Sequence, residues 1–156
     1  MQRGVDHLGI SVTDLARSEA FYCDVLGGRI VFRRHDAGWG QRSVVWLGPH
    51  AIDLNEFADN DGSAFDPKRA GLDHLGFAAD SREELDRWAQ WLDANDVERS
   101  PIRDVRLDAV QDEHALKIGA MFDFLDPDGI QLEFTYIDTS RLPQGATLGE
   151  AAPPDA

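Results

Sequence analysis

The sequence predicts an α+β fold built from two copies of one module, in which a strand is followed by a helix and then by about three strands. The first observation is an internal repeat: Gly4-Val5-Asp6-His7-Leu8-Gly9-Ile10 returns 67 residues later as Gly71-Leu72-Asp73-His74-Leu75-Gly76-Phe77. The second is an amphipathic helical pattern after each copy, and the third is a series of short apolar runs separated by glycine and proline. We therefore expect two similar halves.

Each predicted helix has a clear start. The first follows Thr13 and Asp14, which are good N-cap residues, and the Gly27-Gly28 pair ends it. The second follows Ser81, and Glu84 three positions later completes a capping-box pattern. Apolar side chains recur at helical spacing in both: Leu15, Tyr22, Val25 and Leu26 in the first, and Leu85, Trp88 and Leu92 in the second.

Short strands follow each helix. In the first half they cover residues 29–34, 41–47 and 51–57, and glycine or Gly48-Pro49 separates them. In the second half the last two strands cover residues 118–125 and 130–136. They are joined by Asp126-Pro127-Asp128-Gly129, a turn in which proline fixes φ and glycine tolerates positive φ.

These elements divide the chain into a first module over residues 4–57, a linker over 58–70 and a second module over 71–137. Residues 138–156 contain proline and glycine with few large apolar side chains, which predicts a loose C-terminal tail. The linker is long enough for the two modules to pair within one chain or between two subunits. A two-module plan with such a linker favours a homodimer.

Composition limits the classes of function. The formal net charge of -14 repels phosphate backbones, so nucleic acid is not an expected partner. Apolar runs stay well short of the roughly 18 residues that a membrane-spanning helix needs, so no membrane association is expected. The single cysteine, Cys23, excludes an intrachain disulfide framework, and together with the absence of a signal-peptide pattern it predicts a cytoplasmic location.

Three residues form the sharpest chemical hypothesis. His7 and His74 lie at the same point of the two repeats, so two halves related by pseudo-symmetry can bring both imidazoles to one site. In the last strand, alternate residues face opposite sides, which turns Glu133 away from the helices. The helix-facing residues of that strand are Ile130, Leu132 and Phe134, and the opposite face carries Gln131, Glu133 and Thr135.

Two imidazoles and one carboxylate are ligands that a divalent transition metal favours, with coordination positions left for substrate. Each of the three taken alone is more often a structural residue, but their symmetric placement favours a metal site. His35 and His50 lie near turns without such placement, so surface or core roles are expected for them.

Two further segments complete a resemblance to a known group. The helix motif consists of Ala20, Phe21, Tyr22, Val25, Leu26 and Gly27, and the terminal motif is Asp126-Pro127-Asp128-Gly129-Ile130-Gln131-Leu132-Glu133-Phe134. With the Asp-His-Leu-Gly strands, they resemble the vicinal oxygen chelate superfamily over residues 4–137. That group contains glyoxalase I, fosfomycin-resistance enzymes, bleomycin-resistance proteins, methylmalonyl-CoA epimerase and extradiol dioxygenases. The resemblance implies paired βαβββ modules whose mixed sheet forms a cup around a metal, ligands at His7, His74 and Glu133, and a homodimer.

The resemblance also raises the question of a fourth ligand, which glyoxalase-like members often take from the last strand of the first module. Laying residues 52–56 on 130–134 sets Asn55 opposite Glu133. A neutral amide there favours Fe²⁺ or Mn²⁺, with Zn²⁺ or Ni²⁺ as alternatives. Asn55 is then an expected substrate-binding residue, and so is Glu56 if a one-residue bulge turns it inward, although its plain register points it toward the helix.

A candidate acid or base is His114. It lies 19 residues before Glu133, a position that resembles the acid/base histidine of extradiol dioxygenases. The tyrosine that those enzymes carry between the two has no counterpart, since Asp123 occupies its place. An ordinary loop residue is the alternative interpretation of His114.

The sequence thus predicts a metal-dependent enzyme that acts on a small molecule with vicinal oxygen atoms, with ring-cleavage dioxygenase favoured over glyoxalase-like lyase or isomerase. The competing class is a metal-free protein that binds a small drug molecule, as bleomycin-resistance proteins do. A fosfomycin-type transferase is a weaker third class, because the acidic composition offers no evident cationic site for a phosphonate.

Overall fold

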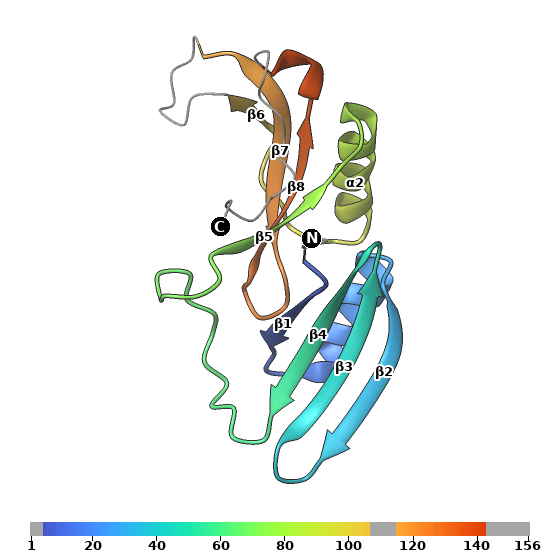
Figure 1. The fold of residues 1–156 in the computed structure, drawn as a ribbon, viewed down its shortest axis with the longest axis vertical. Coiled ribbons are helices and arrows are strands. Elements are labelled where there is room, and N and C mark those ends of the chain that lie inside the picture. The colour runs from blue at the N-terminus through green and yellow to red at the C-terminus, as the bar shows by residue number, and fades with distance from the viewer. Residues whose placement is uncertain (1–4, 107–114, 143–156) are drawn as a thin grey trace, which may run out of the picture. The chain divides into compact units, whose positions relative to one another are not determined.

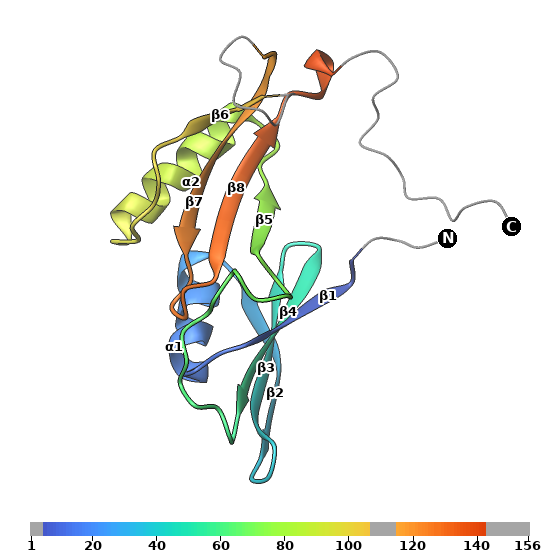
Figure 2. The ribbon, with the colours of Figure 1, turned by 90° about the vertical axis from the view of Figure 1, so that its left-hand side faces the viewer.

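The computed structural model describes residues 5–106 and 115–142, and these residues form two compact units. Unit 1 contains residues 5–65 and takes in the turn 126–129, whereas unit 2 contains the other described residues. Each unit has one four-stranded sheet. The predicted α+β class with two repeated βαβββ modules is confirmed, and each module is a mixed sheet with a helix on one face (Figures 1 and 2).

In unit 1 the strands lie in the order β1-β4-β3-β2. Their bounds are β1 (His7–Ser11), β2 (Arg29–Asp36), β3 (Gly40–Leu47) and β4 (His50–Phe57). β1 is parallel to β4, and the other neighbours are antiparallel. Helix α1 (Leu15–Ala20) continues as a π-helical turn, η1 (Phe21–Val25), and ends before Gly27, whose φ of 74° favours glycine.

Unit 2 repeats this order as β5-β8-β7-β6, with β5 parallel to β8. The bounds are β5 (His74–Ala78), α2 (Arg82–Ala94), β6 (Arg103–Arg106), β7 (Lys117–Leu125) and β8 (Gln131–Ile137). A short 3₁₀ turn, η2 (Thr139–Arg141), follows and falls within the predicted tail. The remainder of that tail from residue 143 lies outside the described residues.

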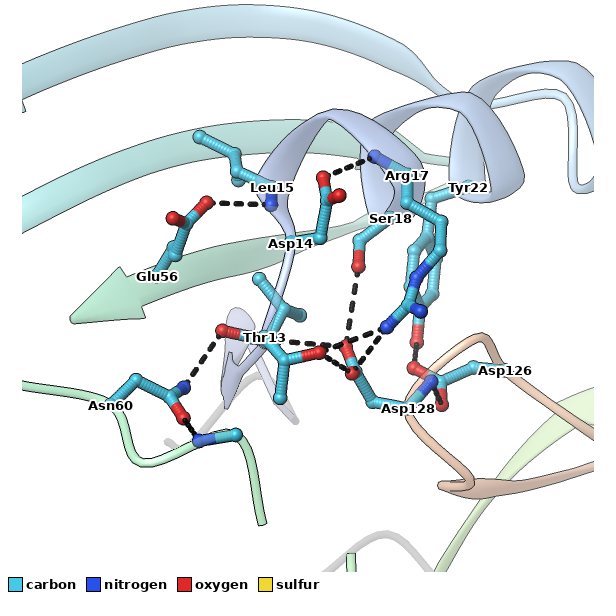
Figure 3. A network of polar contacts seen from close by, with 12 residues as sticks. Thr13, Asp14, Leu15, Arg17, Ser18, Tyr22, Glu56, Asn60, Asp126 and Asp128 are labelled. Atoms are coloured by element: carbon cyan, nitrogen blue, oxygen red, sulfur yellow. Dashed lines mark hydrogen bonds and ion pairs between the residues drawn. The ribbon is translucent and has the colours of Figure 1, made fainter. Parts of the chain in front are cut away.

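The two helices begin where the sequence predicts, but by different means. In α2, the Ser81 hydroxyl accepts from the Glu84 amide at 3.1 Å, and the Glu84 carboxylate accepts from the Asp80 amide at 2.7 Å. In α1, Asp14 accepts from the Arg17 amide at 3.0 Å. Asp128, which belongs to unit 1 although it follows β7 in sequence, adds contacts to the same helix end (Figure 3).

Those contacts make Asp128 a long-range cap. Its carboxylate accepts from the amide and the hydroxyl of Thr13, from Arg17 Nη2 at 2.7 Å and from Ser18 Oγ at 3.4 Å (Figure 3). The side chain is only 7% exposed, so these partners replace water. The Asp-Pro-Asp-Gly turn therefore does more than reverse the chain, because its second aspartate stabilises a helix 110 residues away in sequence.

In each unit the helix packs against one face of the sheet, and the predicted metal ligands lie on the opposite face. Helix-facing residues of unit 1 are buried, among them Val45, Ile52 and Leu54. In unit 2 the buried residues are Leu132 and Phe134 of β8 and Ile130 just before it, and Trp88 of α2 stacks on Phe134 with 4.5 Å between ring centroids. Burying such large side chains stabilises each module by about 1.5–3 kcal/mol apiece. The predicted orientation of Glu133 away from the helix is thereby confirmed.

Helices long and apolar enough to span a bilayer are absent from the described part of the chain.

Candidate metal centre

The residues of the predicted ligand set in unit 2 are His74 and Glu133. His74 begins β5, and its Nδ1 lies 2.8 Å from a carboxylate oxygen of Asp73. Because a carboxylate can only accept, the Nδ1–H donates, and the proton-free Nε2 is left to act as a ligand. Nε2 lies 3.9 Å from Glu133 Oε2. The hydrogen bond to Asp73, followed by the charge of Glu133, raises the pKa of His74.

Glu133 owes its position to the residue beside it in the sheet. In the parallel register of β5 and β8 it pairs with Gly76, and a Cβ atom at position 76 would lie 3.0 Å from Glu133 Oε1. The Thr135 hydroxyl donates to the same oxygen at 3.1 Å. The second glycine of the repeated motif thus makes room for the carboxylate to lie across β5.

Unit 1 contains the matching histidine. His7 begins β1, and its Nδ1 donates to an Asp6 oxygen at 3.0 Å, so that Nε2 is again the available nitrogen. The hydrogen bond to Asp6 and then the charge of Asp53 raise the pKa of His7. Both copies of the repeat therefore hold an imidazole in the same way, by the aspartate that precedes it.

The sheet register identifies the counterpart of Glu133 in unit 1. Gly9 and Gly76 occupy the same place in the repeat; Gly76 pairs with Glu133, and Gly9 pairs with Asp53. Asn55, two residues further along, corresponds instead to Thr135. The predicted correspondence of Asn55 with Glu133 is wrong. Apolar and polar residues alternate with a period of two, so a shift of two residues leaves the pattern unchanged and only the pairing reveals it.

The carboxylate of Asp53 is already paired. Arg42 on the neighbouring strand β3 donates from Nη2 to Asp53 Oδ2. The Asp53 side chain is 10% exposed and that of Arg42 is 37% exposed. Unit 1 therefore has a histidine and a carboxylate at the same register positions as unit 2, but with a guanidinium on the carboxylate.

The two expected substrate-binding residues lie on different faces. Asn55 is on the face that carries His7, and its amide donates to the carbonyls of Asp53 at 3.0 Å and Ile10 at 3.3 Å. Glu56 is on the helix side, where Oε2 accepts from the Leu15 amide at 2.7 Å (Figure 3). Its plain register is confirmed, and the bulge that would turn it inward is not present between β3 and β4. A substrate role for Asn55 stays a prediction.

Asp123, which replaces the tyrosine of extradiol dioxygenases, is held by an arginine. It pairs with Glu133 in the β7–β8 register, and Arg103 Nη2 donates to its Oδ1 at 2.9 Å. The Asp123 contact raises the pKa of Arg103. The carboxylate that stands in place of the tyrosine is therefore occupied by a guanidinium. His114 lies outside the described residues and stays a prediction.

The donor atoms fit a divalent transition metal in chemistry. They are two imidazole nitrogens held by carboxylate hydrogen bonds and one carboxylate oxygen, the combination found in catalytic metal sites. Within the described residues, no group of three His, Cys, Asp or Glu side chains is assembled for a metal. The structure brings His74 and Glu133 together in unit 2 and places His7 in unit 1.

Sequence reasoning did not assign roles to Asp6, Asp73, Asp53, Arg42 or Gly76. The first two carried a usable signal, because an Asp-His pair occurs in both repeats. Gly76 also lies in the repeat, but its role depends on Glu133 approaching it from another strand. Asp53 and Arg42 have no comparable sequence signal.

Comparison with known families agrees with this architecture. The family model of the Glyoxalase/Bleomycin resistance protein/Dioxygenase superfamily matches residues 4–134, so the chain belongs to that superfamily. This confirms the resemblance that the repeated motifs indicate.

Individual relatives span most of the chain. The uncharacterized protein YaeR of Escherichia coli K12 is 32% identical over 83% of this chain and 92% of its own length. The metallothiol transferase FosB of Staphylococcus saprophyticus is 28% identical over 85% of this chain and 76% of its own. Among solved structures, a domain of the superfamily from Frankia sp. EAN1pec has a TM-score of 0.74 at 27% identity, covering 88% of this chain and 99% of that one.

The fosfomycin-resistance protein FosX of Listeria monocytogenes, solved with Mn(II) and sulfate, has a TM-score of 0.63 at 19% identity. It covers 90% of this chain and 98% of its own, and at that identity it supports the fold alone. The relatives of this chain thus include a protein named as a metallothiol transferase.

Proposed function

We propose that this protein is a metal-dependent enzyme that acts on a small molecule with vicinal oxygen atoms, with His7, His74 and Glu133 as the metal ligands. The observation that carries the proposal is the half-site of unit 2, in which Asp73 holds His74 so that Nε2 lies 3.9 Å from Glu133 Oε2. The same Asp-His arrangement at His7 supports it. The three ligands come together through pairing of the modules within one chain or between two.

The chain's own residues prepare the site for such a metal. Asp6 and Asp73 hold the two imidazoles in the tautomer that leaves Nε2 free, and Thr135 orients Glu133. A bound divalent metal supplies Lewis-acid stabilisation of negative charge on the substrate oxygens. Three protein ligands leave coordination positions for two such oxygens. Fe²⁺ and Mn²⁺ remain the predicted metals, and the Mn(II) complex of FosX is consistent with the second.

The register changes which reaction is favoured. Ring cleavage by a dioxygenase was predicted from a neutral Asn55 opposite Glu133, and Asp53 occupies that position instead. The argument for ring cleavage is thereby removed, and because Arg42 holds Asp53 the ligand set does not distinguish the reactions. We favour a reaction without redox change, of the glyoxalase or fosfomycin-enzyme type, on similarity to known relatives. The 28% identity with a metallothiol transferase over 85% of the chain supports this preference over ring cleavage.

Elemental analysis of purified protein tests the ligand set. Wild type should bind one divalent metal per site, and His74→Ala and Glu133→Gln should lose it. His50→Ala is the matched control, since His50 is an exposed histidine outside the proposed set. Equal metal content in all four proteins would reject these ligands, and absence of metal from wild type would favour a metal-free binding protein of the bleomycin-resistance type.

We further propose a homodimer in the cytoplasm. The long linker and the two separate compact units support the dimer, because they allow modules of two chains to pair. Sedimentation at micromolar concentration should detect a species of twice the 17.3 kDa chain mass. A species of single-chain mass alone would show that the modules do not pair between chains.

A further inference from the structure

We propose that Arg42 keeps Asp53 out of the metal's coordination shell, so that the first module contributes a histidine alone. This inference rests on the proposed metal-dependent function. It makes Arg42 a positioning residue, because it acts on the site through Asp53 and sets the number of protein ligands.

Asp53 lies at the position in unit 1 that Glu133, a proposed ligand, occupies in unit 2. It pairs with Gly9 as Glu133 pairs with Gly76, so a carboxylate stands on the strand beside the histidine in both units. If register position alone decided the ligands, Asp53 would be a second carboxylate ligand beside Glu133.

The contacts of the two carboxylates differ. Glu133 contacts the Thr135 hydroxyl and the His74 imidazole, both of which are compatible with metal binding. Asp53 accepts a charge-assisted hydrogen bond from Arg42, and at 10% exposure it has little access to water. The Asp53 side chain is also one methylene shorter, which reduces its reach toward His7 by about 1.5 Å.

Loss of the Asp53 contact would leave the Arg42 guanidinium without its hydrogen-bond acceptor. Its Nε is buried and makes no hydrogen bond within the described residues. If Asp53 turned to a metal, Nη2 would lose its acceptor as well, and a partly buried guanidinium without partners is costly. The ion pair therefore persists when a metal binds, and a coordination position stays open for substrate.

The test is a double-mutant cycle on the full-length protein. Mn²⁺ affinity is measured by calorimetry and the metal-free melting temperature by scanning, for wild type, R42Q, D53N and R42Q/D53N. Arg42→Lys, which retains the charge, should stay close to wild type. Arg82→Gln is the matched control, because it breaks an exposed ion pair with Asp86 on α2 and should change neither quantity.

In the expected result, D53N binds Mn²⁺ within about twofold of wild type. R42Q frees the Asp53 carboxylate and tightens Mn²⁺ binding at least about tenfold, which is the size of effect that residues supporting metal ligands usually have. R42Q/D53N returns to the wild-type affinity. Without metal, R42Q melts about 2–4 °C lower because Asp53 is left uncompensated, and the double variant recovers.

Two results would overturn the inference. If D53N weakens Mn²⁺ binding tenfold or more, Asp53 is a ligand in the wild type and Arg42 does not withhold it. If R42Q melts lower but binds Mn²⁺ as wild type does, the ion pair exists but does not set the ligand number. These two results reject the inference alone, because wild type still binds the metal. A wild type that binds none of Mn²⁺, Fe²⁺, Zn²⁺ and Ni²⁺ rejects the proposed function itself.

Discussion

The two half-sites have the same backbone and different side-chain chemistry. In unit 2 the carboxylate of Glu133 faces His74 at 3.9 Å and accepts a hydroxyl hydrogen bond. In unit 1 the carboxylate at the same register position, Asp53, is bound to Arg42. A repeat therefore supplies equivalent positions, whereas a residue on a third strand, Arg42, makes the contacts of the two carboxylates different.

The helix ends give a second contrast between the units. The start of α2 is capped by residues of its own segment, Ser81 and Glu84. The start of α1 also has a local cap, Asp14, but adds Glu56 and Asp128, which are 41 and 115 residues away in sequence from their partners Leu15 and Thr13. Local residues therefore mark both helix starts, and contacts distant in sequence reinforce that of α1.

The largest expected effect separates the two carboxylates. Glu133→Gln should weaken Mn²⁺ binding by more than about 100-fold, because a neutral amide is a poor ligand and a direct ligand counts for more than its supporting residues. Asp53→Asn should leave affinity close to wild type. Calorimetric titration of both variants side by side checks this, and equal losses would show that the half-sites contribute alike.

The next effect concerns the two helix caps. Asp128→Ala should lower the free energy of unfolding by about 2 kcal/mol, since it removes several hydrogen bonds from a buried carboxylate. Ser81→Ala should cost about 1 kcal/mol, as a local cap does. Urea unfolding provides both values. If Ser81→Ala proves the more damaging, the long-range cap is not the stronger one.

A smaller effect is expected at the two equivalent glycines. Gly76→Ala places a Cβ 3.0 Å from Glu133 Oε1, so it should displace that carboxylate and weaken Mn²⁺ binding about tenfold. At Gly9 the nearest atom to an added Cβ is Asn55 Nδ2 at 3.7 Å, so Gly9→Ala should change little. Similar affinities for the two variants would contradict the role assigned to Gly76.

The smallest effect is on protonation. Asp73→Asn removes the main cause of the raised pKa of His74, so that pKa should fall toward the usual value of about 6.5, which an NMR titration measures. The raised pKa stabilises the metal-free fold below about pH 6.5, and this contribution is lost as pH rises through the folded-state pKa. As pH rises from about 6.5 through the folded-state pKa of His74, the metal-free wild type should therefore lose more stability than Asp73→Asn. An unchanged pKa in the variant would mean that Asp73 does not hold the imidazole.

Metal binding should have the opposite pH dependence. A ligating imidazole must be neutral, so Mn²⁺ affinity should rise with pH through the same interval.

The sequence by itself determined the two-module α+β fold, the helix starts and the face on which Glu133 lies. These follow from local signals: an internal repeat, N-cap residues, and alternation along a strand, each of which acts within a few residues. The repeat likewise placed His7 and His74 at equivalent positions. His114 remains a sequence-based prediction.

Only the tertiary structure decided that Asp53, rather than Asn55, corresponds to Glu133, and that Arg42 binds it. Both facts depend on which residues of neighbouring strands lie side by side. A period of two allows register shifts of two without any change in pattern, and the partner of a charged side chain is set by strand pairing and not by sequence distance.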